Sequence, residues 1–307
     1  MNNKLSFHLA AAHAVLMVLL LFGSCSNKEH TVTDVFEENE IPESVVHDFF
    51  RRNGRDVSVT QARNFQSESF ICIYYTDAQG MSAESHYSHG VWQLDMKRIT
   101  DMEQMPVRVI EALLNMGWGD MWMATSDDRV ALIVRNGIDH QLYDMRFHTP
   151  QADNSWLTCY LLINEDGTVL EQSHDGFNRS EWYRNLDDAL DFVRTRYEGC
   201  DVRGHANHAG YDEFYILHDG YMKQVYFYNN YKKYKNMDDA WMKTEWELDA
   251  AHPLPDAVRM ELDKIKADDT SDFAYDRVFY RETLHGHCYG LQDSRREDAL
   301  TYWIPEP

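Results

Sequence analysis

Basic residues are scarce in this 307-residue chain. Lys and Arg together number 29 against 51 Asp and Glu, so the formal net charge is −22. A surface this acidic repels phosphate backbones and anionic lipid headgroups, which argues against nucleic-acid binding. Hydrophobic residues still make up 44% of the chain and aromatic residues 13%. That composition is typical of a folded protein and not of a disordered one.

Motifs that signal catalysis are also missing. The sequence has no Gly-x-Ser-x-Gly nucleophile elbow and no Gly-rich phosphate loop. Histidines gather in three places: His86 with His89, His205 with His208, and His285 with His287 beside Cys288. None of these groups has a full set of three or four metal ligands at a known spacing. We therefore predict no catalytic residues, no metal site and no cofactor, and we expect these histidines in solvated loops.

One apolar run stands out at the N-terminus, from Leu9 to Phe22, and it is interrupted by His13. It is too short to cross a bilayer as a permanent helix, so it is typical of a signal peptide. Small residues lead directly into Cys25, as in a bacterial lipobox. We predict a lipoprotein signal peptide over residues 1–24 with Cys25 lipidated, and a polar tether over 25–40. The alternative is an ordinary secretory signal with an incidental cysteine.

The residue after the lipidated cysteine indicates the destination. Ser26, where an Asp would favour retention, is similar to the sorting pattern of Gram-negative outer-membrane lipoproteins. We expect a lipid-anchored outer-membrane protein that faces the periplasm or the cell surface. Four further cysteines remain, and they allow three disulfide pairings that the sequence does not separate: Cys72, Cys159, Cys200 and Cys288. Cys72 and Cys159 lie in apolar, strand-like runs, where we expect buried free thiols at least as much as disulfides.

A short pattern of an apolar residue, Pro, two variable residues and Val occurs three times. It begins at Ile41, Met105 and Leu254. A proline suits the start of a helix, and the Val and the residue four places later lie on one helical face. Each copy therefore predicts a short amphipathic helix. Residues 186–193 lack the proline but form the best candidate for a fourth copy.

Strand-like runs and turn signals follow each of these predicted helices. The turns are expected at Asp77–Gly80, Asn136–Gly137, Asp166–Gly167, Asp219–Gly220 and His285–Gly286. Each unit thus predicts one helix followed by three or four antiparallel strands. Neighbouring units are expected either to extend a common sheet or to pack side by side.

The proline-initiated helix, the Asp-Gly hairpin and the terminal Trp of each unit are similar to the β-lactamase-inhibitor-like, PepSY-like family. The resemblance covers residues 41–304 and implies an α+β fold: tandem repeats of one helix packed on a three- to four-stranded antiparallel sheet. We place a first pair of repeats at 41–180 and a second pair at 181–307. The family implies a binding or inhibitory module without established catalytic residues, so none is carried over.

Tyrosines concentrate in one predicted hairpin and give the candidate binding face. We assign Tyr221, Tyr226, Tyr228 and Tyr231 to it, because tyrosine is enriched at contact surfaces. The alternative role is cross-strand pairing that only stabilises the sheet. Because side chains alternate along a strand, Tyr226 and Tyr228 share one face of the sheet and Val225 and Phe227 share the other.

Together these features predict a non-enzymatic cell-envelope lipoprotein that binds a protein or another macromolecule, or inhibits it. The partner would be an envelope or extracellular macromolecule, the membrane would be contacted only through the lipid anchor, and nucleic acid is excluded. Two other functions stay open. One is an envelope hydrolase that uses carboxylates or a His-bound metal, and the other is a carbohydrate-binding module that uses exposed aromatics.

The Cys25→Ser variant tests the predicted anchor. Without the sulfur there is no site for diacylation, and the apolar contact of the acyl chains with the membrane is lost at about 0.8 kcal/mol per methylene. We expect the wild-type chain in the membrane fraction and the variant in the soluble fraction after cell disruption. Equal membrane retention of both chains would contradict lipidation at Cys25.

Overall fold

The structure is a computed structural model. It describes residues 32–66, 69–116, 130–150, 156–173, 185–229, 233–249, 251–268, 273–295 and 301–306. The predicted signal peptide and Cys25 lie outside these residues, as does Tyr231 of the candidate binding face. Within the described ranges, no helix has both the length and the apolar character needed to cross a membrane.

Two antiparallel sheets make up most of the described chain. The first has eight strands in chain order: β1 (Ser58–Phe65), β2 (Phe70–Thr76), β3 (Ser82–Ser88), β4 (Val91–Ile99), β5 (Val130–Arg135), β6 (Ile138–Pro150), β7 (Trp156–Asn164) and β8 (Val169–Ser173). The second has seven: β9 (Asp201–Asn207), β10 (Tyr211–His218), β11 (Tyr221–Tyr228), β12 (Trp241–Leu248), β13 (Arg277–Thr283), β14 (Gly286–Gln292) and β15 (Thr301–Pro305). The five predicted turns lie between consecutive strands of these two meanders.

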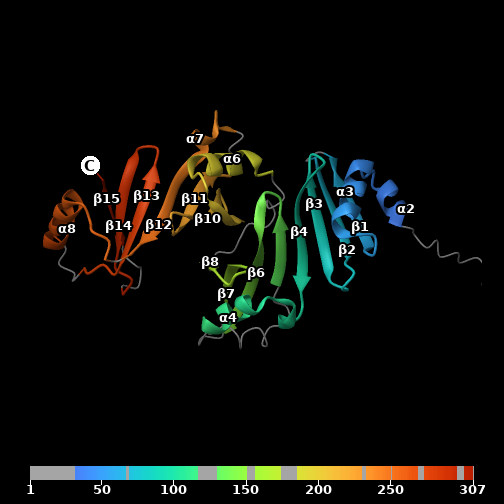
Figure 1. The fold of residues 1–307 in the computed structure, drawn as a ribbon, viewed down its shortest axis with the longest axis horizontal. Helices are drawn as coiled ribbons and strands as arrows, with labels where there is room; N and C mark the ends of the chain where they lie inside the picture. The colour runs from blue at the N-terminus through green and yellow to red at the C-terminus, as the bar shows by residue number, and fades with distance from the viewer. Residues whose placement is uncertain are drawn as a thin grey trace, which may run out of the picture.

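The helices are short and lie along the sheets (Figure 1). They are α2 (Val32–Glu38), α3 (Glu43–Asn53), the 3₁₀ turn η2 (Met102–Gln104), α4 (Val107–Asn115), α6 (Asp187–Arg196), α7 (Met237–Ala240) and α8 (Asp256–Asp268). Helices α3, α4, α6 and α8 lie where the sequence predicts them.

The prolines sit one residue earlier than the first helical turn that we predicted. Pro42 and Pro106 are N-cap residues with extended ψ angles of 138° and 144°. Their carbonyl oxygens accept the first helical hydrogen bonds, from Val45 at 2.9 Å and from Val109 at 3.0 Å. Proline suits this position because a backbone N–H at the start of a helix has no intrahelical acceptor, so the absence of the N–H costs no hydrogen bond.

Each sheet carries its helices on one face. Apolar residues of α2 and α3 pack on β1–β4, those of α4 on β4–β7, those of α6 on β9–β12 and those of α8 on β12–β15. In α3 and α4 the packed residues are Val45 with Phe49 and Val109 with Leu113, spaced four apart as predicted. Phe36 of α2 is also buried, so the segment predicted as a tether contributes to the core.

The predicted fold class, an α+β array of small three- to four-stranded sheets, is wrong. The protein is mostly β, with two large sheets, because strands from neighbouring predicted units pair with each other. Strand β4 pairs with β5 from Leu94↔Arg135 to Ile99↔Val130. Likewise β12 pairs with β13 through Trp246↔Tyr280. An edge strand presents unpaired N–H and C=O groups, and the next strand along the chain satisfies them.

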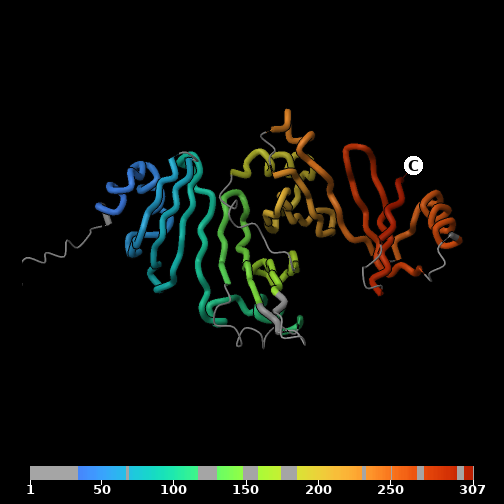
Figure 2. Tube along the Cα trace, turned by 180° about the vertical axis from the view of Figure 1, so that it is seen from behind, coloured from blue at the N-terminus to red at the C-terminus, as the bar shows by residue number. Residues whose placement is uncertain are grey.

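The two sheets meet through their helix-free faces near the middle of the elongated molecule, which Figure 2 shows from behind. We call this contact the seam. It joins apolar residues of both sheets: Leu94, Ala131, Ile133, Leu142, Leu162 and Leu170 of the first, and Ala206 and Tyr215 of the second. The seam leaves β1–β3 at one end and β12–β15 at the other outside this shared core.

The seam depends on close approach at Gly204 in β9. A Cβ added there would lie 2.5 Å from Leu170 Cδ1 and 3.0 Å from Leu142 Cδ2. Both leucines are buried. Glycine in a strand interior often marks such an approach of two layers.

We expect Gly204→Val to destabilise the protein by about 1–3 kcal/mol, since overpacking forces neighbouring side chains off their rotamers. Gly204→Ala should cost less, because it adds one methyl group instead of three carbons. Chemical unfolding of the three proteins measures the series. A valine variant as stable as the wild type would contradict the close contact at this point.

Candidate functional site

A continuous row of aromatic and charged side chains crosses the helix-free face of the second sheet. The Lys243 ammonium nitrogen lies 4.2 Å from the centre of the Tyr226 ring and 3.0 Å from Glu245 Oε2. Arg281 approaches the same Glu245 oxygen at 2.6 Å and places its guanidinium carbon 3.3 Å from the centre of the Trp303 ring. We call these five residues the Tyr226–Trp303 row. It spans β11, β12, β13 and β15.

The row crosses β14 because of a missing side chain. Gly290 of β14 pairs with Trp303, and a Cβ at Gly290 would lie 2.7 Å from the Trp303 ring. The glycine therefore lets the indole lie across its strand and reach Arg281 of β13. Its φ is not in the left-handed region, so the close approach, and not the backbone conformation, requires a glycine here.

The predicted binding tyrosines divide between two faces. Tyr226 and Tyr228 share the helix-free face, while Val225 and Phe227 are buried under α6. Tyr228 is 41% exposed and stacks on Tyr234, which extends the row at its β11 end.

Tyr221 lies on the other face, where it packs against the core under α8. Four residues of the row were not predicted from the sequence: Lys243, Glu245, Arg281 and Trp303. Gly290, a glycine inside a predicted strand, was the available signal for Trp303 and Arg281.

A second polar cluster lies beside the seam and includes the hydroxyl of the seam residue Tyr215. His208 Nε2 lies 3.3 Å from Glu171 Oε2 of the first sheet and 3.2 Å from Glu213 Oε2 of the second. The Tyr215 hydroxyl donates a hydrogen bond to Glu171, and all four residues are largely shielded from solvent. Strand β8 thus supplies one carboxylate and β10 the other, with the imidazole between them.

These contacts set the charge states of the cluster. Burial alone would lower the pKa of His208, but hydrogen bonds and charges from Glu171 and Glu213 outweigh it and raise that pKa to about 9. Burial raises the pKa of Glu213. A protonated imidazole between two carboxylates offsets their mutual repulsion, so we assign the cluster a structural role in joining the sheets.

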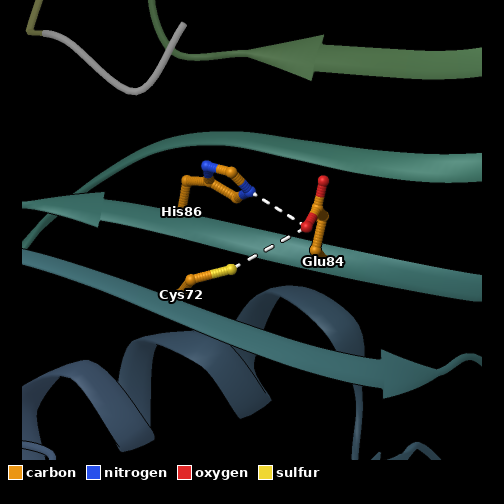
Figure 3. Close-up of side chains that lie close together, drawn as sticks. All are labelled: Cys72, Glu84 and His86. Atoms are coloured by element: carbon orange, nitrogen blue, oxygen red, sulfur yellow. Dashed lines mark hydrogen bonds and ion pairs between the residues drawn. The ribbon is translucent and has the colours of Figure 1, made fainter. Parts of the chain in front are cut away.

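A third cluster lies on the helix-free face of the first sheet (Figure 3). Cys72 of β2 pairs directly with His86 of β3, and Glu84 lies two residues before His86 on the same face. Glu84 Oε2 is 3.9 Å from Cys72 Sγ and 3.5 Å from His86 Nε2. The side chains point toward one another from adjacent strands, as Figure 3 shows.

This cluster does not have the properties of a thiol nucleophile. Burial, with a smaller contribution from Glu84, raises the pKa of the Cys72 thiol to about 12. Reactive cysteines need a lowered pKa and access to solvent, whereas Cys72 is 2% exposed. All four described cysteines are free thiols in the structure.

The histidine groups singled out in the sequence have different surroundings. His89 and His285 are exposed in hairpin turns, as expected for solvated loops. His205 and His208 are buried, contrary to that expectation. His205 Nε2 contacts Asp212 Oδ1 at 3.0 Å inside the second sheet.

The His208 cluster makes stability depend on pH in a defined direction. The folded-state pKa of His208, about 9, lies above the ordinary value near 6.5. Between these two pH values the folded chain keeps a proton on His208 that the unfolded chain has released. The contribution is complete below about pH 6.5 and is lost as pH rises through 9. We expect it to be on the order of 3 kcal/mol. Denaturant unfolding of wild type and His208→Gln at pH 6 and pH 9.5 isolates it.

Exposed His285→Gln is the matched control and should follow the wild type. If His208→Gln loses as much stability between the two pH values as the wild type, the assignment of the proton to His208 is wrong.

Comparison with known proteins adds distant structural likenesses. No protein-family model and no curated protein matches the chain. Solved structures similar to it include a BLIP-like protein from Bacteroides fragilis, with a TM-score of 0.35, 11% identity and coverage of 45% of this chain and 90% of that one. A DUF2874 family protein from Bacteroides ovatus gives a TM-score of 0.33 and 12% identity over 52% and 97% of the two chains.

A Bacteroides eggerthii protein described as periplasmic gives a TM-score of 0.31 and 13% identity over 44% of this chain and 88% of that one. Likenesses of this strength do not assign the chain to a family.

Proposed function

We propose that this chain is a non-enzymatic envelope lipoprotein that binds a folded protein partner through the Tyr226–Trp303 row. The observation that supports the proposal most directly is the continuous set of contacts from Tyr226 through Lys243, Glu245 and Arg281 to Trp303. Blocking or inhibiting that partner would be the consequence if the row covers the partner's own active surface.

The composition of the row supports a protein partner. Trp, Tyr and Arg are the residue types most enriched at binding hot spots. Here one of each lies on a single sheet face, within a few strands of one another. The chain's net negative charge favours a partner with basic groups around an apolar centre.

The order of the row also lowers the cost of binding. Immobilising a flexible side chain at an interface costs about 0.5–1.5 kcal/mol. Lys243 and Arg281 are already held by Glu245, and Trp303 is held between Gly290 and Arg281. A partner would meet side chains that are positioned before it arrives, as in a preorganised interface.

A site-specific photocrosslinker tests where the partner binds. One protein carries it in place of Tyr228, which is 41% exposed beside the row, and a control carries it in place of Met260, which is 65% exposed on α8. We expect a discrete protein adduct in intact cells from position 228 and none from position 260. Adducts from neither position, or equally from both, would contradict binding at this face.

Trp303→Ala then measures the contribution of the row to affinity. Truncating a hot-spot aromatic typically costs 2 kcal/mol or more, which corresponds to a loss of roughly 30-fold. Adduct yield from position 228 should fall accordingly, while Met260→Ala should leave it unchanged. Circular dichroism confirms that both variants are folded.

A further inference from the structure

We propose that Cys72, Glu84 and His86 form a zinc site on the helix-free face of the first sheet. The three ligand atoms would be the cysteine sulfur, one carboxylate oxygen and an imidazole nitrogen. A fourth position would face solvent. The site is separate from the Tyr226–Trp303 row and does not depend on the proposed function.

The spacing of the ligand atoms fits a tetrahedral ion. Ligands about 2.0–2.3 Å from a Zn²⁺ ion at tetrahedral angles lie about 3.3–3.6 Å from one another. Glu84 Oε2 lies 3.5 Å from His86 Nε2 and 3.9 Å from Cys72 Sγ, and all three ligand atoms lie within 4.8 Å of one another. Small side-chain adjustments would therefore complete the coordination without any change in the strands.

The sheet register holds the three ligands in place. Cys72 and His86 are direct cross-strand partners, and Glu84 pairs with Tyr74, one step along the same face. Side chains two apart on a strand share a face, so Glu84 and His86 project together above β3. A site built on paired strands keeps its geometry better than one built on loops.

The His86 imidazole makes few hydrogen bonds in this structure. His86 Nδ1 is shielded from solvent and has no hydrogen-bond partner among the described residues, and the shielded Nε2 faces only the Glu84 carboxylate at 3.5 Å. Buried polar atoms without partners are uncommon in folded proteins and call for an explanation such as a bound ion. The Phe70 ring packs edge-to-face with the imidazole, with 5.4 Å between the ring centres.

The donor set selects the kind of metal. Thiolate, imidazole and carboxylate together suit Zn²⁺, whereas Mg²⁺ and Ca²⁺ prefer oxygen ligands alone. On binding, the Cys72 thiol releases its proton to solvent and the sulfur forms a bond to the ion, so charge and atoms balance. The side chains of Glu84 and His86 are 27% and 13% exposed, so the ion and a water as the fourth ligand would enter from their side of the sheet.

Cobalt substitution gives a direct test on the mature, full-length protein. Co²⁺ added to the metal-free chain should bind at one equivalent and produce a near-ultraviolet sulfur-to-metal charge-transfer band, which Zn²⁺ should abolish by displacement. This band requires a cysteine ligand and therefore separates this site from the Glu171–His208–Glu213 cluster. Absence of the band in the wild-type protein would overturn the proposal.

Matched variants locate the ligands. Cys72→Ser should remove the band, and His86→Gln should weaken Zn²⁺ binding by more than about 100-fold, beyond the loss typical of residues around the ligands. Cys159→Ser and His89→Gln are the controls and should behave as the wild type. A band that persists in Cys72→Ser, or Zn²⁺ affinity that falls equally in His89→Gln and His86→Gln, would refute the assignment. Far-ultraviolet circular dichroism checks that each variant is folded.

Discussion

Contact between the helix-free faces of the two sheets determines which surfaces of this protein remain open. Each sheet has one face covered by its own helices and needs a second layer only where its other face is apolar. At the seam, leucines of the first sheet meet Ala206 and Tyr215 of the second, and Gly204 allows the layers to approach. Because this contact involves only part of each sheet, the two ends keep helix-free faces that carry polar and aromatic residues.

The open faces differ from the seam in how their charges are satisfied. At the seam His208 is shielded from solvent between two carboxylates, and a charge there is tolerated only because it is paired. On the open face of the second sheet, Glu245 pairs with Lys243 and Arg281 while all three keep contact with solvent. Pairs of the second kind add little stability. They do hold Lys243 against the Tyr226 ring and Arg281 against the Trp303 ring.

Two segments with similar sequences can have different neighbours in space. Residues 92–95 (Trp-Gln-Leu-Asp) and 246–249 (Trp-Glu-Leu-Asp) have nearly the same sequence. In the structure Trp92 Nε1 donates to Asp95 at 3.0 Å, whereas Asp249 caps a turn by accepting from the backbone of Ala251 at 2.8 Å. The residue placed like Trp92 is Trp241, whose Nε1 donates to Thr244 Oγ1 at 3.1 Å. Similarity over four residues therefore does not determine which hydrogen bonds the tryptophan and the aspartate make.

The sequence by itself determined the helices that follow Pro42, Pro106 and Pro255, the turns between strands, and the face shared by Tyr226 and Tyr228. These features depend on residues within a few positions of one another, through proline geometry, turn chemistry and strand alternation. Only the tertiary structure decided that the strands continue into two sheets, that Trp303 crosses Gly290 to reach Arg281, and that Cys72 meets Glu84 and His86. Those outcomes depend on the register in which each strand pairs with the next and on whether pairing continues from one predicted unit into the following one, and the turn and helix signals specify neither.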